Sequence, residues 1–364
     1  PSSGKIYRDP LGVVLIISPW NYPVQLSLVP LIGAIAAGNC AVLKPSEMAT
    51  ATEKLISKII SETFNENYIN VVTGDGAGVI PEMINLFHFN HIFFTGSTAV
   101  GKAIYKLAAD QLIPVTLELG GKSPCIVESD ADLKVAARRI VMGKFLNAGQ
   151  TCIAPDYILV KESVKEKLLN ELAATIEAFY TNDPSTSYDY GKIINQKRFQ
   201  KLTSFLSEGT IFYGGKTEES KLYIQPTILT DITMEDSVMK EEIFGPVLPV
   251  MSFTTIDEAI NIVEQNNSPL SFYLFTKNNS IEAEWLRKAT FGGGCINNTV
   301  YHFSNLKMPF GGVGNSGIGS YHGKKTFEIF SHAKPVLKTG TWLDPEIKYP
   351  PLKGKLNLLK KFIG

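Results

Sequence analysis

The segment FLNAGQTCIAP, residues 145–155, places Cys152 directly after small and polar residues. A cysteine that only fills a core usually has apolar neighbours. A thiol in an accessible loop, in contrast, can attack a carbonyl carbon once it has lost its proton. The position of Cys152 therefore indicates a nucleophile, and a packing cysteine is the alternative.

Two other residues could serve the same reaction. Asn21 lies in SPWNYP, residues 18–23, where the flanking prolines make a rigid turn, and a fixed amide is a good donor to an oxyanion. Glu118 ends an apolar segment just before Gly120 and Gly121. Desolvation there is expected to raise its pKa and to suit it to act as a general base. An Asx-turn residue and a solvent-facing carboxylate are the alternatives.

Two segments combine features of a dinucleotide site. In LKPSE, residues 43–47, Lys44 and Glu47 follow a strand. Ligands of an open parallel sheet bind at that end of the strands, so both side chains could hold ribose hydroxyls. In FTGSTAVGK, residues 94–102, a turn precedes a helix whose free N–H groups suit a pyrophosphate. The residues of interest in this turn and helix are Gly96, Ser97, Thr98 and Gly101. A surface lysine and an ordinary capped helix are the alternatives.

Two further segments are less specific. KEEIFGP, residues 240–246, places Glu242 beside the apolar Ile243 and Phe244, and a capping or surface carboxylate is the alternative. GDGAG, residues 74–78, contains only half of the G-x-G-x-x-G dinucleotide fingerprint and does not follow the first strand. We therefore interpret it as a turn.

Strand-like and helix-like segments alternate along the first third of the chain. β-branched and apolar runs predict buried parallel strands at residues 12–18, 40–45, 68–72, 91–96 and 114–119. The segments between them predict helices at residues 24–37, 50–63 and 99–109. This alternation predicts an α/β fold built on a doubly wound parallel sheet.

The segment ELGGKSP, residues 118–124, predicts a crossing into a second α/β domain, because paired glycines and a proline interrupt both helices and strands. Strands are then predicted at residues 124–128, 157–161, 246–253 and 270–276. Helices are predicted at residues 133–146 and 164–180, and a polar surface loop at residues 182–190.

The composition excludes several classes of protein. The 364 residues contain 35 Lys+Arg and 35 Asp+Glu, so no net charge attracts nucleic acid. The four cysteines have neither zinc-ligand spacing nor the density of a disulfide framework, which predicts no metal, reduced thiols and a cytoplasmic location. No apolar run is long enough to cross a bilayer.

The C-terminal segment KLNLLKKFIG has Leu356, Leu359 and Phe362 at helical spacing. A segment of this length is a weak membrane anchor. We therefore expect it to pack on its own domain, and contact with a membrane or with a partner subunit is the alternative.

Taken together, the motifs PWN, LKPSE, FTGST-x-VG, LELGGKSP, GQ-x-C and E-x-FGP occur in the order found in the aldehyde dehydrogenase superfamily. The resemblance extends from about Gly12 to about Gly323 and so covers nearly the whole chain. The segment PFGGVGNSGIGSYHG, residues 309–323, is most similar to the class 3 branch. That branch favours fatty and aromatic aldehydes and tends to form dimers.

The resemblance assigns roles residue by residue. It implies that Cys152 is the nucleophile, that Asn21 and the backbone N–H of Cys152 form the oxyanion hole, and that Glu118 activates water. The other roles that it implies are cofactor contacts: Lys44 and Glu47 near the adenosine ribose, Ser97 in the turn of residues 96–98 at the pyrophosphate, Glu242 and Phe244 at the nicotinamide ribose, and Trp20 beside them.

The implied activity is the oxidation of aldehydes to carboxylic acids with NAD or NADP, through a cysteine thiohemiacetal and a thioester, in a homodimer. A coenzyme A-dependent acylating enzyme and an inactive truncated relative with a structural role are the alternatives. The expected domains are residues 11–119 for the dinucleotide and 120–325 for catalysis. Residues 1–10 and 326–345 are expected to be strands that bridge two subunits, and residues 346–364 a tail.

One departure from the family pattern concerns the start of the chain. The family carries a helical segment before the point where this sequence begins, and that segment covers part of the cofactor domain. Without it, one face of the first sheet is expected to be uncovered, which leaves the activity of the chain open.

Overall fold

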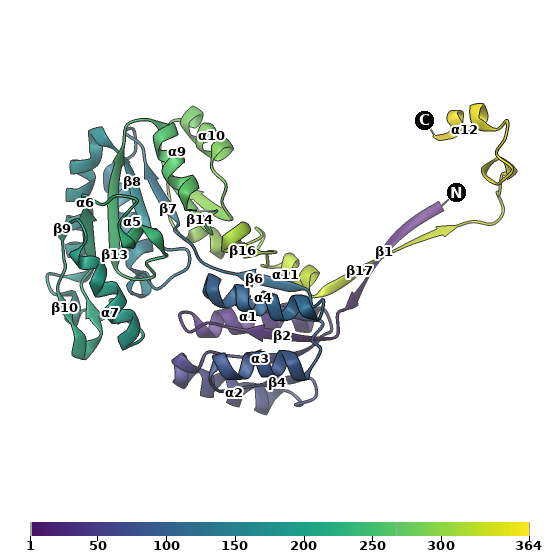
Figure 1. Cartoon of the computed structure of the whole chain (residues 1–364), viewed down its shortest axis with the longest axis horizontal. Helices are drawn as coiled ribbons and strands as arrows, with labels where there is room; N and C mark the ends of the chain where they lie inside the picture. Colours follow the sequence, from purple (N-terminus) through teal and green to yellow (C-terminus); the bar gives the residue numbers. More distant parts are fainter. Residues whose placement is uncertain (1, 267, 364) are drawn as a thin grey trace.

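The computed structural model describes residues 2–266 and 268–363 and contains two mainly parallel sheets and a projecting arm (Figure 1). The first sheet has six strands in the order β16-β6-β5-β2-β3-β4. Its strands are β2 (Val13–Ile17), β3 (Cys40–Lys44), β4 (Ile69–Val71), β5 (His91–Thr95), β6 (Val115–Glu118) and β16 (Gly317–Ile318). All pairs are parallel except that of β16 with β6. The five predicted strands and the doubly wound fold class are thus confirmed.

Helices cover both faces of this sheet. α1 (Pro23–Ala36) and α2 (Thr50–Thr63) pack on one face, and α3 (Gly76–Leu86) and α4 (Thr98–Asp110) pack on the other. Residues of β2 alternate between these two cores, as a strand buried on both faces requires. The expectation of an uncovered face is therefore wrong for the described residues. The interpretation of residues 74–78 as a turn is also wrong, because α3 begins within them.

The second sheet has seven strands in the order β15-β14-β7-β8-β13-β12-β9. Its strands are β7 (Pro124–Val127), β8 (Tyr157–Lys161), β9 (Thr210–Tyr213), β12 (Thr227–Thr230), β13 (Val247–Phe253), β14 (Ser271–Phe275) and β15 (Gly293–Ile296). The helices of this half are α5 (Leu133–Phe145), α6 (Lys165–Tyr180), α7 (Gln196–Ser204), α8 (Ser237–Lys240), α9 (Ile256–Gln265) and α10 (Asn279–Lys288). The sequence predicted β7, β8, β13, β14, α5 and α6 and missed the rest.

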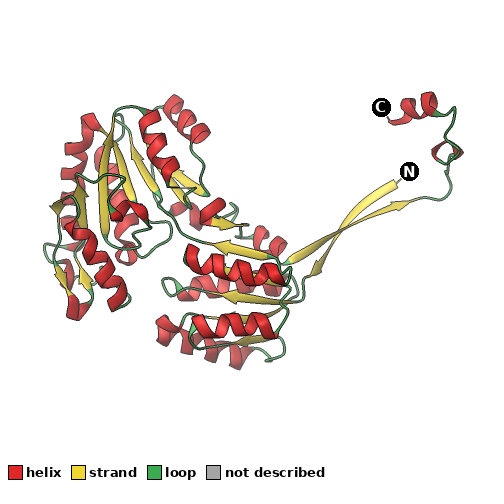
Figure 2. Ribbon diagram, in the orientation of Figure 1, coloured by secondary structure: helices red, strands yellow, loops and turns green. Residues whose placement is uncertain are grey.

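The two ends of the chain form a two-stranded arm. β1 (Ser2–Pro10) pairs antiparallel with β17 (Ser331–Thr339), which follows α11 (Lys324–Ile329). The arm leaves the body at the first sheet and projects away from both sheets (Figure 2). This pairing matches the two strands that the family resemblance placed at the chain ends.

The C-terminal helix α12 (Leu356–Ile363) lies beyond the tip of the arm, remote from both sheets (Figure 1). The prediction of a helix is confirmed, whereas the expectation that this segment packs on its own domain is wrong. Leu356 is 61% exposed, and the side chains of Leu359 and Phe362 lie outside the described residues. No described helix is both long and apolar enough to cross a membrane.

A buried ion pair lies where the chain passes from the first sheet to the second. Lys122, which follows β6, lies 2.5 Å from the carboxylate of Asp156, which precedes β8. The backbone N–H of Asp156 also donates to the carbonyl of Ser123. The crossing predicted at residues 118–124 is thus fixed by charged groups that have little access to water.

We expect Lys122→Met to lower the free energy of unfolding by roughly 3–5 kcal/mol, because it leaves the Asp156 carboxylate buried without its cation. Urea unfolding followed by circular dichroism measures the change. The control is Lys58→Met, which removes an exposed ion pair with Glu62 and should leave the midpoint unchanged. Equal midpoints for the two variants would contradict the prediction.

Candidate active site

The loop that carries Cys152 has an unusual backbone. Asn147, Ala148 and Gly149 have successive φ values of 52°, 53° and 76°, a left-handed conformation that is strained for the first two residues. A Cβ at Gly149 would lie 2.3 Å from the carbonyl oxygen of Gly245, so glycine is required there. The sequence between α5 and β8 therefore folds as a tight kink just before Cys152.

Gln150 holds this kink in place. Its side-chain amide donates to the carbonyls of Asn147 at 3.0 Å and Lys192 at 2.9 Å, and its Oε1 accepts the N–H of Ile194 at 2.9 Å. The Gln150 side chain is buried. The structure thus explains why glutamine stands in the GQ-x-C motif, which the sequence alone did not explain.

Cys152 faces a cavity of about 80 Å³ that it shares with Glu118. Most of the lining is apolar or aromatic. The lining residues are Tyr22, Gln25, Leu26, Thr95, Glu118, Leu146, Thr151, Cys152, Ile153, Leu270, Val300, Phe303, Phe310, Tyr321 and His322. Two of the three groups predicted to do chemistry therefore meet in one small space.

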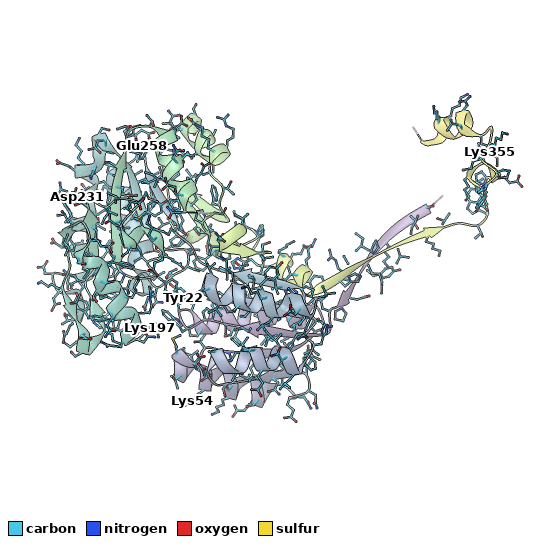
Figure 3. The ribbon with its side chains drawn as sticks, viewed as in Figure 1. Tyr22, Lys54, Lys197, Asp231, Glu258 and Lys355 are labelled. Carbon is cyan, nitrogen blue, oxygen red and sulfur yellow. The ribbon has the colours of Figure 1, made fainter. Side chains whose placement is uncertain are left out.

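Asn21 contacts the cysteine loop and is not among the residues that line this cavity. Its Nδ2 donates to the carbonyl of Gln150 at 3.1 Å, and Asn147 Nδ2 donates to the carbonyl of Asn21 at 3.1 Å. The hydroxyl of Tyr22, labelled in Figure 3, lies 2.7 Å from that of Thr151. The segment after β2 thus holds the residues just before Cys152, and the second N–H of the Asn21 amide has no bond to a described residue.

Glu118 ends β6 and is 2% exposed. Neither carboxylate oxygen has a hydrogen-bond partner among the described residues. Burial therefore raises the pKa of Glu118 well above its usual value of 4.5. Burial also raises the pKa of the Cys152 thiol to about 12, with smaller contributions from the charges of Glu242 and Glu118. In this arrangement the thiol is protonated, so a nearby proton acceptor is needed to activate it.

Lys44 and Glu47 form one polar cluster at the end of β3. Lys44 Nζ donates to Glu47 Oε2 at 2.7 Å, and Glu47 Oε1 accepts the N–H of Gly76 at the start of α3 at 3.3 Å. Lys44 is buried, so it is not the surface lysine of the alternative interpretation. The cluster offers a carboxylate and an ammonium group, which suit the hydroxyls of a ribose.

The turn before α4 lies at the end of β5. Ser97 caps α4 by accepting the N–H of Val100 at 3.4 Å. A Cβ at Gly101 would lie 2.6 Å from a methyl group of Leu119, so the helix packs closely on the chain that follows β6. Thr98 Oγ1 donates to the carbonyl of Asn315 at 3.4 Å. The N-terminus of α4 is therefore placed at the strand ends, where its N–H groups suit a pyrophosphate.

Glu242 and Phe244 meet this region from the second sheet. A Cβ at Gly120 would lie 2.1 Å from Glu242 Oε2, so the carboxylate packs directly on the backbone after β6. Burial, and then the charge of Asp156, raise the pKa of Glu242 to about 8. The ring of Phe244 contacts that of Trp20 edge to face, with centroids 5.5 Å apart. The predicted cofactor residues thus lie at strand ends of both sheets, and their chemistry fits a dinucleotide.

The sequence did not single out several residues of the cavity. The buried Thr95 Oγ1 and His322 Nδ1 have no hydrogen-bond partner among the described residues. Tyr321 is 2% exposed, and burial, followed by the charges of Glu118 and Cys152, raises its pKa. Tyr321 and His322 belong to the segment of residues 309–323 that carried the class 3 resemblance, but only the fold brings them to the cysteine. No group of metal-ligating side chains is found in the described part of the chain.

Comparisons with known proteins agree with this geometry. A model of the aldehyde dehydrogenase family matches residues 2–336. The 4,4'-diaponeurosporen-aldehyde dehydrogenase of Staphylococcus aureus is 48% identical over 100% of this chain and 79% of its own length. A mouse aldehyde dehydrogenase described as dimeric and NADP-preferring is 44% identical over 96% of this chain and 78% of its own. A substrate-bound structure of Staphylococcus aureus AldH superposes with a TM-score of 0.97 at 47% identity, covering 100% of this chain and 80% of that one.

The chain belongs to the aldehyde dehydrogenase family. It is an enzyme that oxidises aldehydes with NAD or NADP as the cofactor. The family resemblance, the α/β fold and the activity predicted from the sequence are therefore confirmed.

The raised pKa of Glu118 predicts how the stability of the folded chain changes with pH. A carboxyl group whose pKa is higher in the folded state contributes stability that is fully present below pH 4.5, and that contribution is lost as the pH rises toward the folded-state pKa. In Glu118→Gln the side chain at position 118 is an amide and cannot ionise. We therefore expect this variant to be more stable than the native chain at pH 8 and to lose that advantage near pH 4.5. Thermal unfolding across this range measures the difference. A difference that does not change with pH would contradict the prediction.

Proposed function

We propose that the aldehyde is oxidised while it is covalently attached to Cys152, and that Asn21 and Glu118 supply the oxyanion donor and the base. The observation that carries this proposal is the cavity shared by Cys152 and Glu118. The hydrogen bond from Asn21 to the carbonyl of Gln150 supports the proposal further. Gln150 stands two positions before Cys152 in the sequence, so this bond holds the Asn21 amide against the loop that carries the nucleophile.

The first step is loss of the thiol proton. With a pKa of about 12, Cys152 forms little thiolate alone. The carboxylate of Glu118, which has no hydrogen-bond partner among the described residues, is the proton acceptor in the same cavity. The thiolate then adds to the carbonyl carbon and makes a tetrahedral oxyanion. The second N–H of the Asn21 amide, together with the backbone N–H of Cys152, stabilises this charge.

The cofactor residues act by position. Lys44 and Glu47 would hold the adenosine ribose, and the N-terminus of α4 with Ser97 would hold the pyrophosphate. Glu242, Phe244 and Trp20 would hold the nicotinamide end. NAD or NADP, when bound, accepts the hydride that leaves the carbonyl carbon. The organic product of this step is a thioester on Cys152.

Hydrolysis of the thioester completes the reaction. Glu118 first releases the proton that it took from Cys152 to solvent and then removes a proton from water. The water oxygen attacks the thioester carbon, and the Cys152 thiolate leaves with the electrons of the C–S bond. The raised pKa of Glu118 supports this role, since a carboxylate whose pKa is raised by burial is a stronger base. A base beside the sulfur supports water over coenzyme A as the acyl acceptor. The presence of all three groups supports an active enzyme over an inactive relative.

The proposal extends to substrate and assembly. The largely apolar lining of the cavity supports an apolar aldehyde.

Exposed apolar side chains on the arm, Ile6 and Leu337 among them, support pairing with a second copy of the chain through β1 and β17. The mouse relative described as dimeric supports the same assembly. A catalytic free thiol suits the reducing cytoplasm.

Cys152→Ser should lower turnover by roughly a thousandfold or more, as expected when a nucleophile is removed. The initial burst of NADH or NADPH should disappear as well. Cys295→Ser is the matched control, because Cys295 is also a partly buried free cysteine and has no role in the proposed chemistry. Rapid-mixing absorbance measures both. A burst that survives in Cys152→Ser would overturn the proposal.

Asn21→Ala should lower kcat by about a hundredfold to a thousandfold with little change in KM, since an oxyanion donor acts mainly in the transition state. Asn147→Ser removes the amide of the cysteine loop that donates to the Asn21 carbonyl and should lose far less activity. Steady-state kinetics with a saturating cofactor distinguishes the two variants. Equal losses of kcat in the two variants would indicate that Asn21 only holds the loop that carries Cys152.

A further inference from the structure

The segment of residues 241–244 carries two proposed cofactor contacts and belongs to no helix or strand. It connects α8 to β13. Phe244 has a φ of 46°, a left-handed conformation that is unfavourable for a bulky residue. Such a segment needs outside support to keep one conformation, so the source of that support bears on cofactor binding.

Two buried side chains from the domain crossing support the segment. Lys122 Nζ donates to the carbonyls of Val238 at 2.8 Å and Glu241 at 3.0 Å, in addition to its ion pair with Asp156. Asp156 Oδ1 accepts the N–H of Ile243 at 2.9 Å. All three ammonium donors and both carboxylate oxygens of the pair are thus used.

A third side chain completes the support from the other side. Arg198 on α7 is half-buried, and its guanidinium donates to the carbonyl of Ile243 at 2.5 Å. Both backbone polar groups of Ile243 are therefore bonded to charged side chains. Ile243 lies between Glu242 and Phe244, so its backbone sets the directions in which those two side chains leave the chain.

We propose that Lys122, Asp156 and Arg198 are positioning residues that form a backbone clamp, which holds Glu242 and Phe244 in the geometry that binds the nicotinamide end of NAD or NADP. The clamp rests on the proposed function, in which Glu242 and Phe244 contact the cofactor. Its members come from three separate parts of the chain. Each member bonds to backbone groups, so the clamp fixes conformation and leaves the cofactor-facing side chains free.

Arg198 is the member to test, because it is only half-buried and its removal leaves the Lys122–Asp156 pair intact. We expect Arg198→Met to raise the Kd for NADH or NADPH about tenfold, the range expected for loss of one charged hydrogen bond. Arg198→Lys keeps a donor and should restore most of the affinity. Fluorescence titration of the purified enzyme without aldehyde measures the Kd.

The matched control is Lys201→Met. Lys201 lies on the same helix and forms an exposed ion pair with the side chain of Glu241 at 2.5 Å, so this variant removes the same charge near the same segment without freeing its backbone. Its Kd should match that of the native enzyme. An equal rise in both variants, or no rise in Arg198→Met, would overturn the clamp.

Two further measurements distinguish the clamp from general damage to the fold and from failure of the Glu242 contact. Hydrolysis of an activated ester by Cys152 needs no cofactor, so its rate should be unchanged in Arg198→Met. A fall in this rate together with cofactor affinity would indicate general damage to the fold and would overturn a positioning role. Glu242→Gln tests the proposed function itself. An unchanged Kd in Glu242→Gln would contradict the Glu242 contact in the proposed function. If Glu242→Gln weakens cofactor binding and Arg198→Met does not, only the clamp is contradicted.

Discussion

The site depends on a close backbone contact between two glycine segments. Gly149, in the kink before Cys152, lies against the carbonyl of Gly245, directly after Phe244. A side chain at Gly149 would push apart the cysteine loop and the segment that faces the cofactor. The nucleophile and the proposed nicotinamide contacts are thus placed by one steric constraint, and the bonds of Gln150 keep the kink from relaxing.

Charge burial around this contact works against stability. Glu118 is enclosed without a hydrogen-bond partner among the residues that the structure describes, and burial raises the pKa of Glu118, Glu242 and Cys152. Ionised groups in such surroundings are costly for a folded chain. The same surroundings give Glu118 the basicity that proton removal requires. The well-packed cores of both sheets offset this cost.

Much of the first sheet was predictable because its strands are continuous apolar runs that end at polar motifs. α3 was missed because Gly76, Gly78 and Pro81 weaken the helical pattern that its tertiary packing overrides. Short strands such as β9 and β12 gave too little signal. Cys152 and Glu118 were recognisable from their neighbours in sequence. Tyr321 and His322 were not, since only long-range folding brings them to the cavity.

The pairing of β1 with β17 connects the first residues of the chain to residues more than three hundred positions later. β17 has no other partner strand in the described part of the sheet topology. A chain shortened at its beginning would therefore leave a long strand with open hydrogen-bonding groups and exposed Val336 and Leu337. Such an edge attracts strands from other molecules. Proteolytic trimming near residue 10 would thus promote aggregation while leaving the residues that line the catalytic cavity intact.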